Sequence, residues 1–228
     1  MLYRDVLIRA ADITARNREE LLSEMHRVLF ALVLLRDPLT PAGLAQLIEI
    51  IPHHVDAILR RFSAVLMVEV GRPITLFHPS FHEFMQDSLR CTLPPGNGAF
   101  NFHVDAPQHH LEMARYCLRL MNASNLPYDI CDIRDPTLPN VHVEDLNARL
   151  EQNISESLRY ACQHWMTHLA AGLLQPGEGI ASVLVDLNIF CKTYLFPWLE
   201  VLSLIGKVPV ASSSLMSTIS WCEVSLYY

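Results

Sequence analysis

The chain has little glycine, and none of its eight glycines begins a phosphate-binding loop. Such a loop needs spaced glycines before a lysine, so that backbone N–H groups can surround the phosphates. Gly96-Asn97-Gly98 is followed by Ala99-Phe100, and Gly206-Lys207 is followed by Val208, with no glycine at the required upstream position. Without this loop, or a carboxylate placed to hold Mg²⁺, the chain cannot transfer a phosphoryl group unaided. We therefore expect it not to be an enzyme.

Positive charge is also scarce, because 17 basic residues face 24 acidic ones and the formal net charge is −7. Affinity for nucleic acids depends on neutralising phosphates, so this balance argues against a nucleic-acid partner. The longest uninterrupted apolar run, residues 28–35, is far below the roughly 20 residues that cross a bilayer. Six cysteines without a CxxC pair, and no secretory signal after Met1, indicate a reduced, cytoplasmic protein with no membrane partner.

What the chain does contain is helical periodicity. A first helix, with apolar residues from Leu22 to Leu32, is expected to end near Asp37-Pro38. Thr40-Pro41 joins a capping hydroxyl to a first-turn proline and predicts the start of a second helix. Pro52 opens a third, whose apolar residues follow one helix face: Val55, Ile58, Leu59, Phe62 and Leu66.

Two short apolar segments, residues 67–70 and 74–77, flank Gly71-Arg72-Pro73 and predict a β-hairpin. Three helices and a hairpin form a winged helix, which we place at residues 22–91. The chain is thus expected to be mainly α, with a winged-helix domain followed by an α-helical array. Composition and periodicity give the other boundaries: 1–21 as the end of a preceding helical segment, 92–106 as a linker, 107–207 as the α-helical domain and 208–228 as a divergent, poorly ordered tail.

The junction after the hairpin, from Leu76 to Phe84, is the most informative stretch for function. Pro79 suits the first position of a helix, and Phe81 and Phe84 then repeat at helical spacing. His78 therefore precedes a helix N-terminus, where its two ring nitrogens can meet a ligand. A helix-capping histidine is the structural alternative, and spacing alone favours it.

The other candidate residues favour packing over chemistry. His164 and His168 lie four apart on one helix face and could chelate a metal, but no general-base Glu lies between them. The adjacent histidine pairs at 53–54 and 109–110 diverge on a helix, and Ser80 lacks the GxSxG context of a nucleophile. No catalytic residue and no metal ligand is predicted.

Four motifs follow one another along the chain: LLRDPLT at 34–40, FHPSFHEF at 77–84, LRYACQHWMTHL at 158–169 and WLEVLSLIG at 198–206. In this order they resemble the region downstream of the NTPase core in fungal NACHT proteins, a group of STAND nucleotide switches. The resemblance covers nearly the whole chain up to Lys207.

The resemblance implies a non-catalytic regulatory and interaction segment of an NLR-like signalling NTPase. Its winged helix would close over the nucleotide site, and its helical array would lead to sensor repeats. Only His78 matches a ligand-contacting position of the family, where the histidine touches the phosphate of bound ADP. The chain itself then needs no cofactor, ADP or ATP binds the parent core, and protein partners, including self-assembly, are expected.

The sequence departs from the family in lacking the nucleotide core and the sensor repeats, and residues 208–228 do not resemble the family's continuation. A truncated product would explain this. The alternative interpretation is a free-standing winged-helix regulator that binds DNA through its third helix. Residues 38–90 hold four arginines against five acidic residues, which weakens that alternative.

Overall fold

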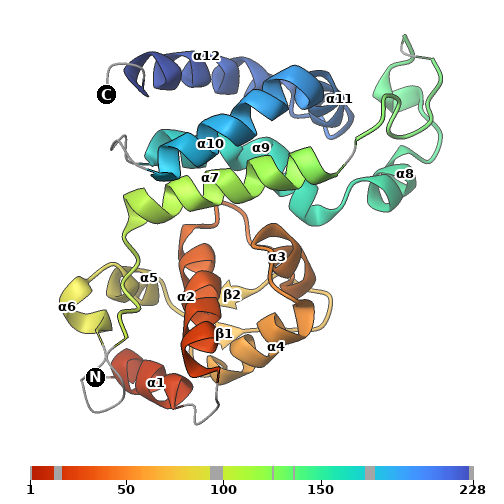
Figure 1. Ribbon diagram of the computed structural model, residues 1–228. Helices are drawn as coiled ribbons and strands as arrows, with labels where there is room; N and C mark the ends of the chain where they lie inside the picture. The colour runs from red at the N-terminus through yellow and green to blue at the C-terminus, as the bar shows by residue number, and fades with distance from the viewer. Residues whose placement is uncertain are drawn as a thin grey trace. The chain divides into compact units, whose positions relative to one another are not determined.

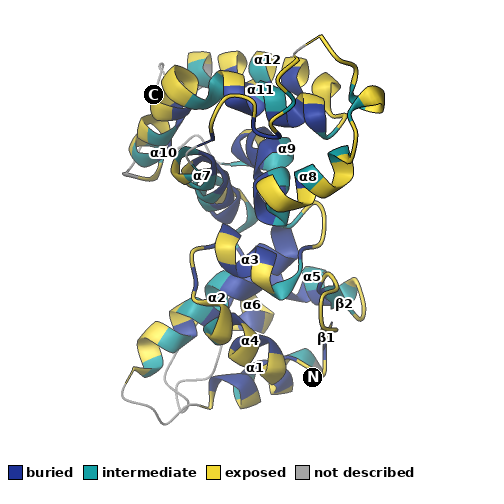
Figure 2. Cartoon of the chain, turned by 90° about the vertical axis from the view of Figure 1, so that its right-hand side faces the viewer, coloured by how far each residue is buried: buried dark blue, intermediate teal, exposed yellow. Residues whose placement is uncertain are grey.

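The computed structural model describes residues 2–12, 17–92, 100–124, 126–135, 137–172 and 178–225. The chain is mainly helical, as predicted, and one small two-stranded sheet is described (Figure 1). It forms two compact units, residues 1–109 and residues 110–228. Each unit has its own set of buried apolar side chains (Figure 2).

The elements of unit 1 before residue 92 include the helices and the hairpin that the sequence predicts, and a further short helix at 88–91 that it does not. They are α1 (Leu2–Ala11), α2 (Arg18–Leu34), α3 (Pro41–Leu47), α4 (Pro52–Arg61), β1 (Leu66–Met67), β2 (Thr75–Leu76), α5 (Ser80–Met85) and α6 (Ser88–Cys91). Thr40 caps α3 as expected, because its hydroxyl oxygen accepts the Gly43 N–H at 3.1 Å. Pro41 and Pro52 are the first residues of their helices. The apolar face predicted for the third helix is buried throughout: Val55, Ile58, Leu59, Phe62 and Leu66.

The hairpin is antiparallel but shorter than predicted. Leu66 pairs with Leu76 and Met67 with Thr75, and Gly71 in the connection adopts φ +70°, which glycine reaches without strain. Val68 and Val70 lie outside the core, since Val68 is exposed and Val70 fully so, whereas Ile74 is buried without being part of a strand. Alternation of apolar residues therefore overstated the length of both strands.

Residues 100–105 are not a linker, in contrast to the prediction for 92–106, of which residues 93–99 lie outside the described part. Phe102 and Val104 are buried in unit 1. The Phe102 N–H donates to the Cys91 carbonyl at 3.3 Å, and the Val104 N–H donates to the Met85 carbonyl at 2.8 Å. The prolines and glycines at 94–98 favoured a linker, but Phe102 and Val104, which follow them, belong to the core of unit 1.

Unit 2 is an array of helices around an aromatic centre. It comprises the later part of α7 (Ala106–Ala123), a 3-10 turn (Asn140–His142), α8 (Leu146–Asn153), α9 (Glu156–Ala171), α10 (Glu178–Ile189), a π turn (Phe190–Tyr194), α11 (Leu195–Leu204) and α12 (Val208–Ser225). Trp165, Phe190 and Trp198 are fully buried, with ring centroids 5.1 to 6.1 Å apart. The Trp198 indole N–H donates to the Cys162 carbonyl at 2.8 Å, so this buried ring is also hydrogen-bonded.

Residues 208–225 form helix α12, which corrects the prediction of a poorly ordered tail; residues 226–228 lie outside the described part. Its buried positions repeat at helical spacing: Ala211, Ser214, Thr218 and Trp221. Two of these are hydroxyl residues, which a hydrophobic pattern does not count. The Thr218 hydroxyl donates to the Ser214 carbonyl at 2.7 Å, so its burial leaves no lost hydrogen bond.

One helical stretch, Gly179–Leu204, is long and apolar enough to cross a membrane by length and composition alone. The sequence prediction missed it because charged residues, such as Asp186 and Lys192, interrupt the apolar run. Asp186 is held within unit 2 by Arg115, with Nε and Oδ2 3.4 Å apart. A single helix of this kind is only a weak indication of insertion, and the chain is compatible with a soluble protein.

Candidate functional site

His78 lies between β2 and α5 with an exposed side chain. Its Nδ1 atom accepts the Ser80 N–H at 3.1 Å, in the manner of a helix-capping side chain. A nitrogen that accepts a hydrogen bond carries no proton, so in the neutral ring the proton is on Nε2. No residue that the structure describes pairs with Nε2. The capping alternative therefore applies to Nδ1, while Nε2–H remains a donor on an exposed side chain.

Helix α5 begins one residue after the predicted start. Pro79 precedes its first residue but already has helical backbone angles, φ −61° and ψ −23°. The predicted apolar face is correct, since Phe81, Phe84 and Met85 are buried. The helix is thus fixed by three core side chains, and its N-terminus holds His78 at the surface.

Ser80 connects His78 to α1. The Ser80 Oγ atom lies 2.7 Å from His78 Nδ1 and 2.8 Å from the Tyr3 hydroxyl. Because Nδ1 is an acceptor, the Ser80 hydroxyl donates to it, and the Tyr3 hydroxyl then donates to Ser80. The Tyr3 ring packs against Phe81 and Phe84, with each centroid 5.3 Å away. This series of contacts orients the imidazole from the core side.

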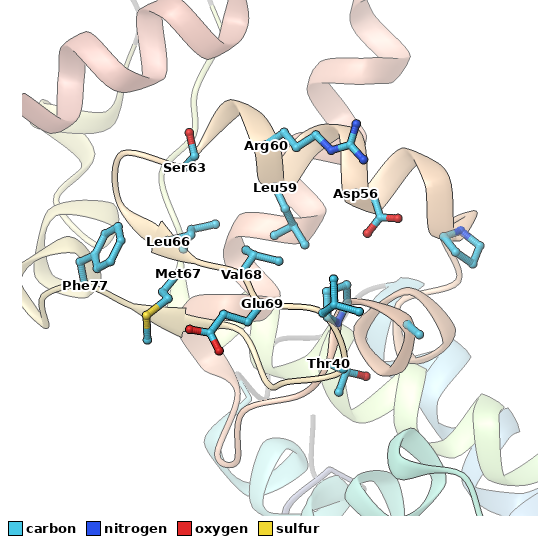
Figure 3. A pocket seen from close by; sticks show the side chains of 15 residues that line it. Thr40, Asp56, Leu59, Arg60, Ser63, Leu66, Met67, Val68, Glu69 and Phe77 are labelled. Carbon is cyan, nitrogen blue, oxygen red and sulfur yellow. The ribbon is translucent and has the colours of Figure 1, made fainter.

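A groove of about 740 Å³ lies between α4 and the hairpin, and Phe77, the neighbour of His78, lines it (Figure 3). We name it the α4–hairpin groove. Most of its lining is apolar: Leu59, Leu66, Met67, Val68, Val70 and Phe77. Val70 is fully exposed and Phe77 is 59% exposed. Exposed apolar side chains around a groove of this size are typical of a surface that contacts a partner.

The charges along the α4–hairpin groove are mixed. Asp56 and Arg60 come from α4, one turn apart, and Glu69 comes from the hairpin (Figure 3). The other arginine of α4 has a structural role, because Arg61 Nη1 donates to the Ala10 carbonyl at the end of α1, at 3.0 Å. One arginine and two carboxylates give this face no excess of positive charge.

Two histidines of unit 1, the buried His109 and the half-buried His26, lie in an aromatic cluster that the sequence did not predict. His109 stacks on Phe30 with centroids 4.5 Å apart, and its edge meets His26 at 5.0 Å. Burial lowers the pKa of His109 to about 4, and burial also lowers the pKa of His26. Both rings are therefore neutral at pH 7 and serve the core of unit 1.

Unit 2 has its own buried histidine pair. Nδ1 of His110 and Nδ1 of His168 are 2.8 Å apart, and His168 Nε2 lies 2.7 Å from the Tyr160 hydroxyl. Both nitrogens of His168 thus contact protein groups, and the His164 ring lies tilted against Tyr160, with centroids 4.7 Å apart. The spacing of His164 and His168 reflects packing, which is the interpretation the sequence favoured. Across the described residues, no group of three or more His, Cys, Asp or Glu could hold a metal ion.

The cysteines show no sign of a reactive thiol. Cys91, Cys117, Cys131 and Cys162 are buried, and burial raises the pKa of Cys91 to about 11. Burial also raises the pKa of Cys117 and of Cys162, where no neighbouring cation stabilises a thiolate. These four residues act as small apolar side chains.

The adjacent pair His109-His110 illustrates what the sequence could signal. Neighbours on a helix point apart, as predicted, and here one contacts Phe30 in unit 1 and the other contacts His168 in unit 2. Their contact partners are distant in sequence and could not be predicted from it.

Comparisons with protein-family models, with curated proteins and with solved structures find no match to this chain.

Proposed function

We propose that this chain is a non-catalytic regulatory and interaction segment of a NACHT-type STAND signalling NTPase. In this proposal α2, α3, α4 and the hairpin form a winged helix that closes over the nucleotide site of the parent protein. Unit 2 is the helical array that connects it to sensor repeats. The proposal rests on the resemblance of four ordered motifs and on the chemistry of His78.

The observation that carries the proposal is the protonation of His78. Nδ1 accepts from Ser80, so the neutral ring presents Nε2–H as a donor on an exposed side chain. A phosphate oxygen of ADP is a suitable acceptor for such a donor. A contact made only in the nucleotide-bound, closed form would favour that form over the open one.

The surface around this histidine supports a protein partner over DNA. The α4–hairpin groove is mainly apolar and carries Asp56 and Glu69 beside a single Arg60. Arg61 is engaged by the Ala10 carbonyl. A helix that reads the major groove needs cations for the flanking phosphates, and α4 supplies too few.

Two measurements test this proposal against the DNA-binding alternative. Sequencing the full transcript should reveal a glycine-rich phosphate-binding loop encoded in frame upstream. Fluorescence anisotropy with random duplex DNA at low salt should show no salt-dependent binding by the chain. A transcript without that loop, or micromolar binding that weakens steeply with added salt, would favour the winged-helix regulator instead.

A further inference from the structure

Helix α10 has two apolar faces, and only one of them is buried. Val183, Leu187 and the following Phe190 point into the core of unit 2. On the other side, exposed residues repeat at i, i+3, i+4, i+7 and i+8: Ala181, Leu184, Val185, Asn188 and Ile189. We call these five residues, together with the exposed Phe196 in the first turn of α11, the α10 stripe. A helix at the surface of a monomer normally has a polar outer face.

The orientation of the helix is fixed by polar contacts on its inner side. Asp186 forms an ion pair with Arg115, and the Asn122 side chain donates to the Asp186 carbonyl at 2.9 Å. The α10 stripe therefore lies outward because the opposite face is both packed and hydrogen-bonded. It is not an apolar helix that could rotate to bury these side chains.

We propose that the α10 stripe is the contact surface of a homodimer, in which α10 of a second copy packs antiparallel across a two-fold axis. The axis would lie between Asn188 and Ile189. This inference is independent of the proposed nucleotide switch, because it concerns unit 2 and uses none of the residues around His78.

The order of side-chain sizes along the α10 stripe is self-complementary about that axis. The small Ala181 at one end would face the large Phe196 of the second copy, and the reverse contact would repeat at the other end. Val185 would face Lys192, whose methylene stem can cover an apolar side chain while the ammonium group stays in water. Asn188 sits next to the axis, where one polar residue in an apolar seam fixes the register.

Charge also favours a second copy. The chain has a net charge of −7, which opposes association in general. The six residues of the α10 stripe carry no charge, and Asp186, on the inner side of α10, is paired with Arg115. Two identical stripes therefore meet without opposing like charges, whereas most of the acidic surface stays apart.

The exposed area is sufficient for a specific contact. Leu184 is 38% exposed, Val185 60%, Ile189 41% and Phe196 67%. These fractions leave roughly 400 Å² of apolar side chain in each copy, which is already the size of the largest patch on a typical monomer. Two copies would cover about 800 Å² from these four residues alone, which is in the size range of small, reversible protein–protein contacts.

The test is sedimentation of the full chain over a range of concentrations. The wild type should be a dimer, and Val185→Glu should be a monomer at the same concentrations, with at least a 100-fold weaker dissociation constant. Met216→Glu is the matched control, because Met216 is 66% exposed on α12 and lies outside the α10 stripe. A wild type that stays monomeric, or a dimer that only the control disrupts, would overturn the proposal.

A cross-linking experiment keeps the proposal testable if Val185→Glu fails to fold. In a Cys191→Ser, Cys222→Ser background, Asn188→Cys should form a covalent dimer on oxidation, whereas Met216→Cys should not. Equal cross-linking of both variants would contradict the two-fold axis. Flotation with phosphatidylcholine vesicles tests whether a lipid surface covers the α10 stripe in place of a second copy. A chain that is monomeric in buffer and floats with the vesicles would show that the α10 stripe contacts lipid instead.

Discussion

Nδ1 of His78 accepts the backbone N–H of Ser80 at 3.1 Å and lies 2.7 Å from the hydroxyl of the same residue. One ring nitrogen therefore supports the start of α5, and the other keeps its proton. The two roles that the sequence set against each other, capping and ligand contact, belong to different atoms of one side chain. They can consequently be separated by substitution.

The capping role predicts a modest loss of stability in His78→Ala. We expect unfolding free energy to fall by about 1 kcal/mol, as for other lost helix caps. His78→Asn should recover most of this loss, because asparagine is among the best capping residues. Thermal melts followed by far-UV circular dichroism compare the three proteins. A His78→Ala protein as stable as the wild type would show that the Ser80 N–H does not depend on this cap.

The core of unit 1 should be far more sensitive at Phe81, which is 1% exposed and packs against Tyr3. Phe81→Ala is expected to cost roughly 3–5 kcal/mol, the usual range for a buried aromatic side chain. Phe77→Ala is the control, because this ring is 59% exposed and its removal should cost less than about 0.5 kcal/mol. Denaturant unfolding measures both. Similar losses in the two variants would mean that Phe81 is not a core residue.

Acid should weaken unit 1 through His109 and His26. Burial lowers the pKa of His109 to about 4, whereas an unfolded histidine titrates near about 6.5. Between these values the unfolded chain binds more protons than the native one, so stability falls as the pH decreases from about 6.5 toward 4. The unfolding free energy should fall by up to about 1.4 kcal/mol per pH unit for each histidine that binds a proton only in the unfolded chain.

Urea unfolding at pH 7.5 and pH 5 tests this pH dependence. His109→Phe keeps a ring against Phe30 but cannot titrate, so its loss of stability on acidification should be smaller than that of the wild type. Tryptophan fluorescence reports the unfolding of unit 2 separately from that of unit 1, because all three tryptophans, Trp165, Trp198 and Trp221, belong to unit 2. If the wild type and the variant respond equally to acid, His109 is not the residue that titrates.

Helix α12 should be part of the core of unit 2. Trp221 is 5% exposed, so Trp221→Ala is expected to cost roughly 3–5 kcal/mol. Met216→Ala, on the exposed side of the same helix, should change stability by less than about 0.5 kcal/mol. Deleting residues 208–228 should lower the melting temperature as well. A truncated chain that melts at the wild-type temperature would restore the poorly ordered tail that the sequence suggested.

Local signals explain which parts of the fold the sequence predicts. Thr40-Pro41 and Pro52 set the starts of α3 and α4 through hydrogen bonding and backbone angle within one turn. The inward face of α12 was missed because Ser214 and Thr218 are polar by residue type, yet buried once their hydroxyls bond within the chain.

The candidate site shows the same division between local and distant contacts. His78 could be selected from its own neighbours in sequence, since a proline and two phenylalanines follow it. The contact that orients the Ser80 hydroxyl toward the ring could not, because it comes from Tyr3, 77 residues before Ser80. His110 and His168 are 58 residues apart, and only folding brings their nitrogens together.

The proposed nucleotide contact of His78 is measured most directly as the dissociation rate of ADP from the complete parent NTPase that we propose. His78→Asn keeps the helix cap and removes the imidazole Nε2–H, while His82→Asn changes a second histidine of α5 as the matched control. We expect ADP to leave the His78→Asn protein about tenfold faster, the effect of losing one hydrogen bond to a charged group, and His82→Asn to leave the rate unchanged. Equal dissociation rates from the wild-type and His78→Asn proteins would contradict it.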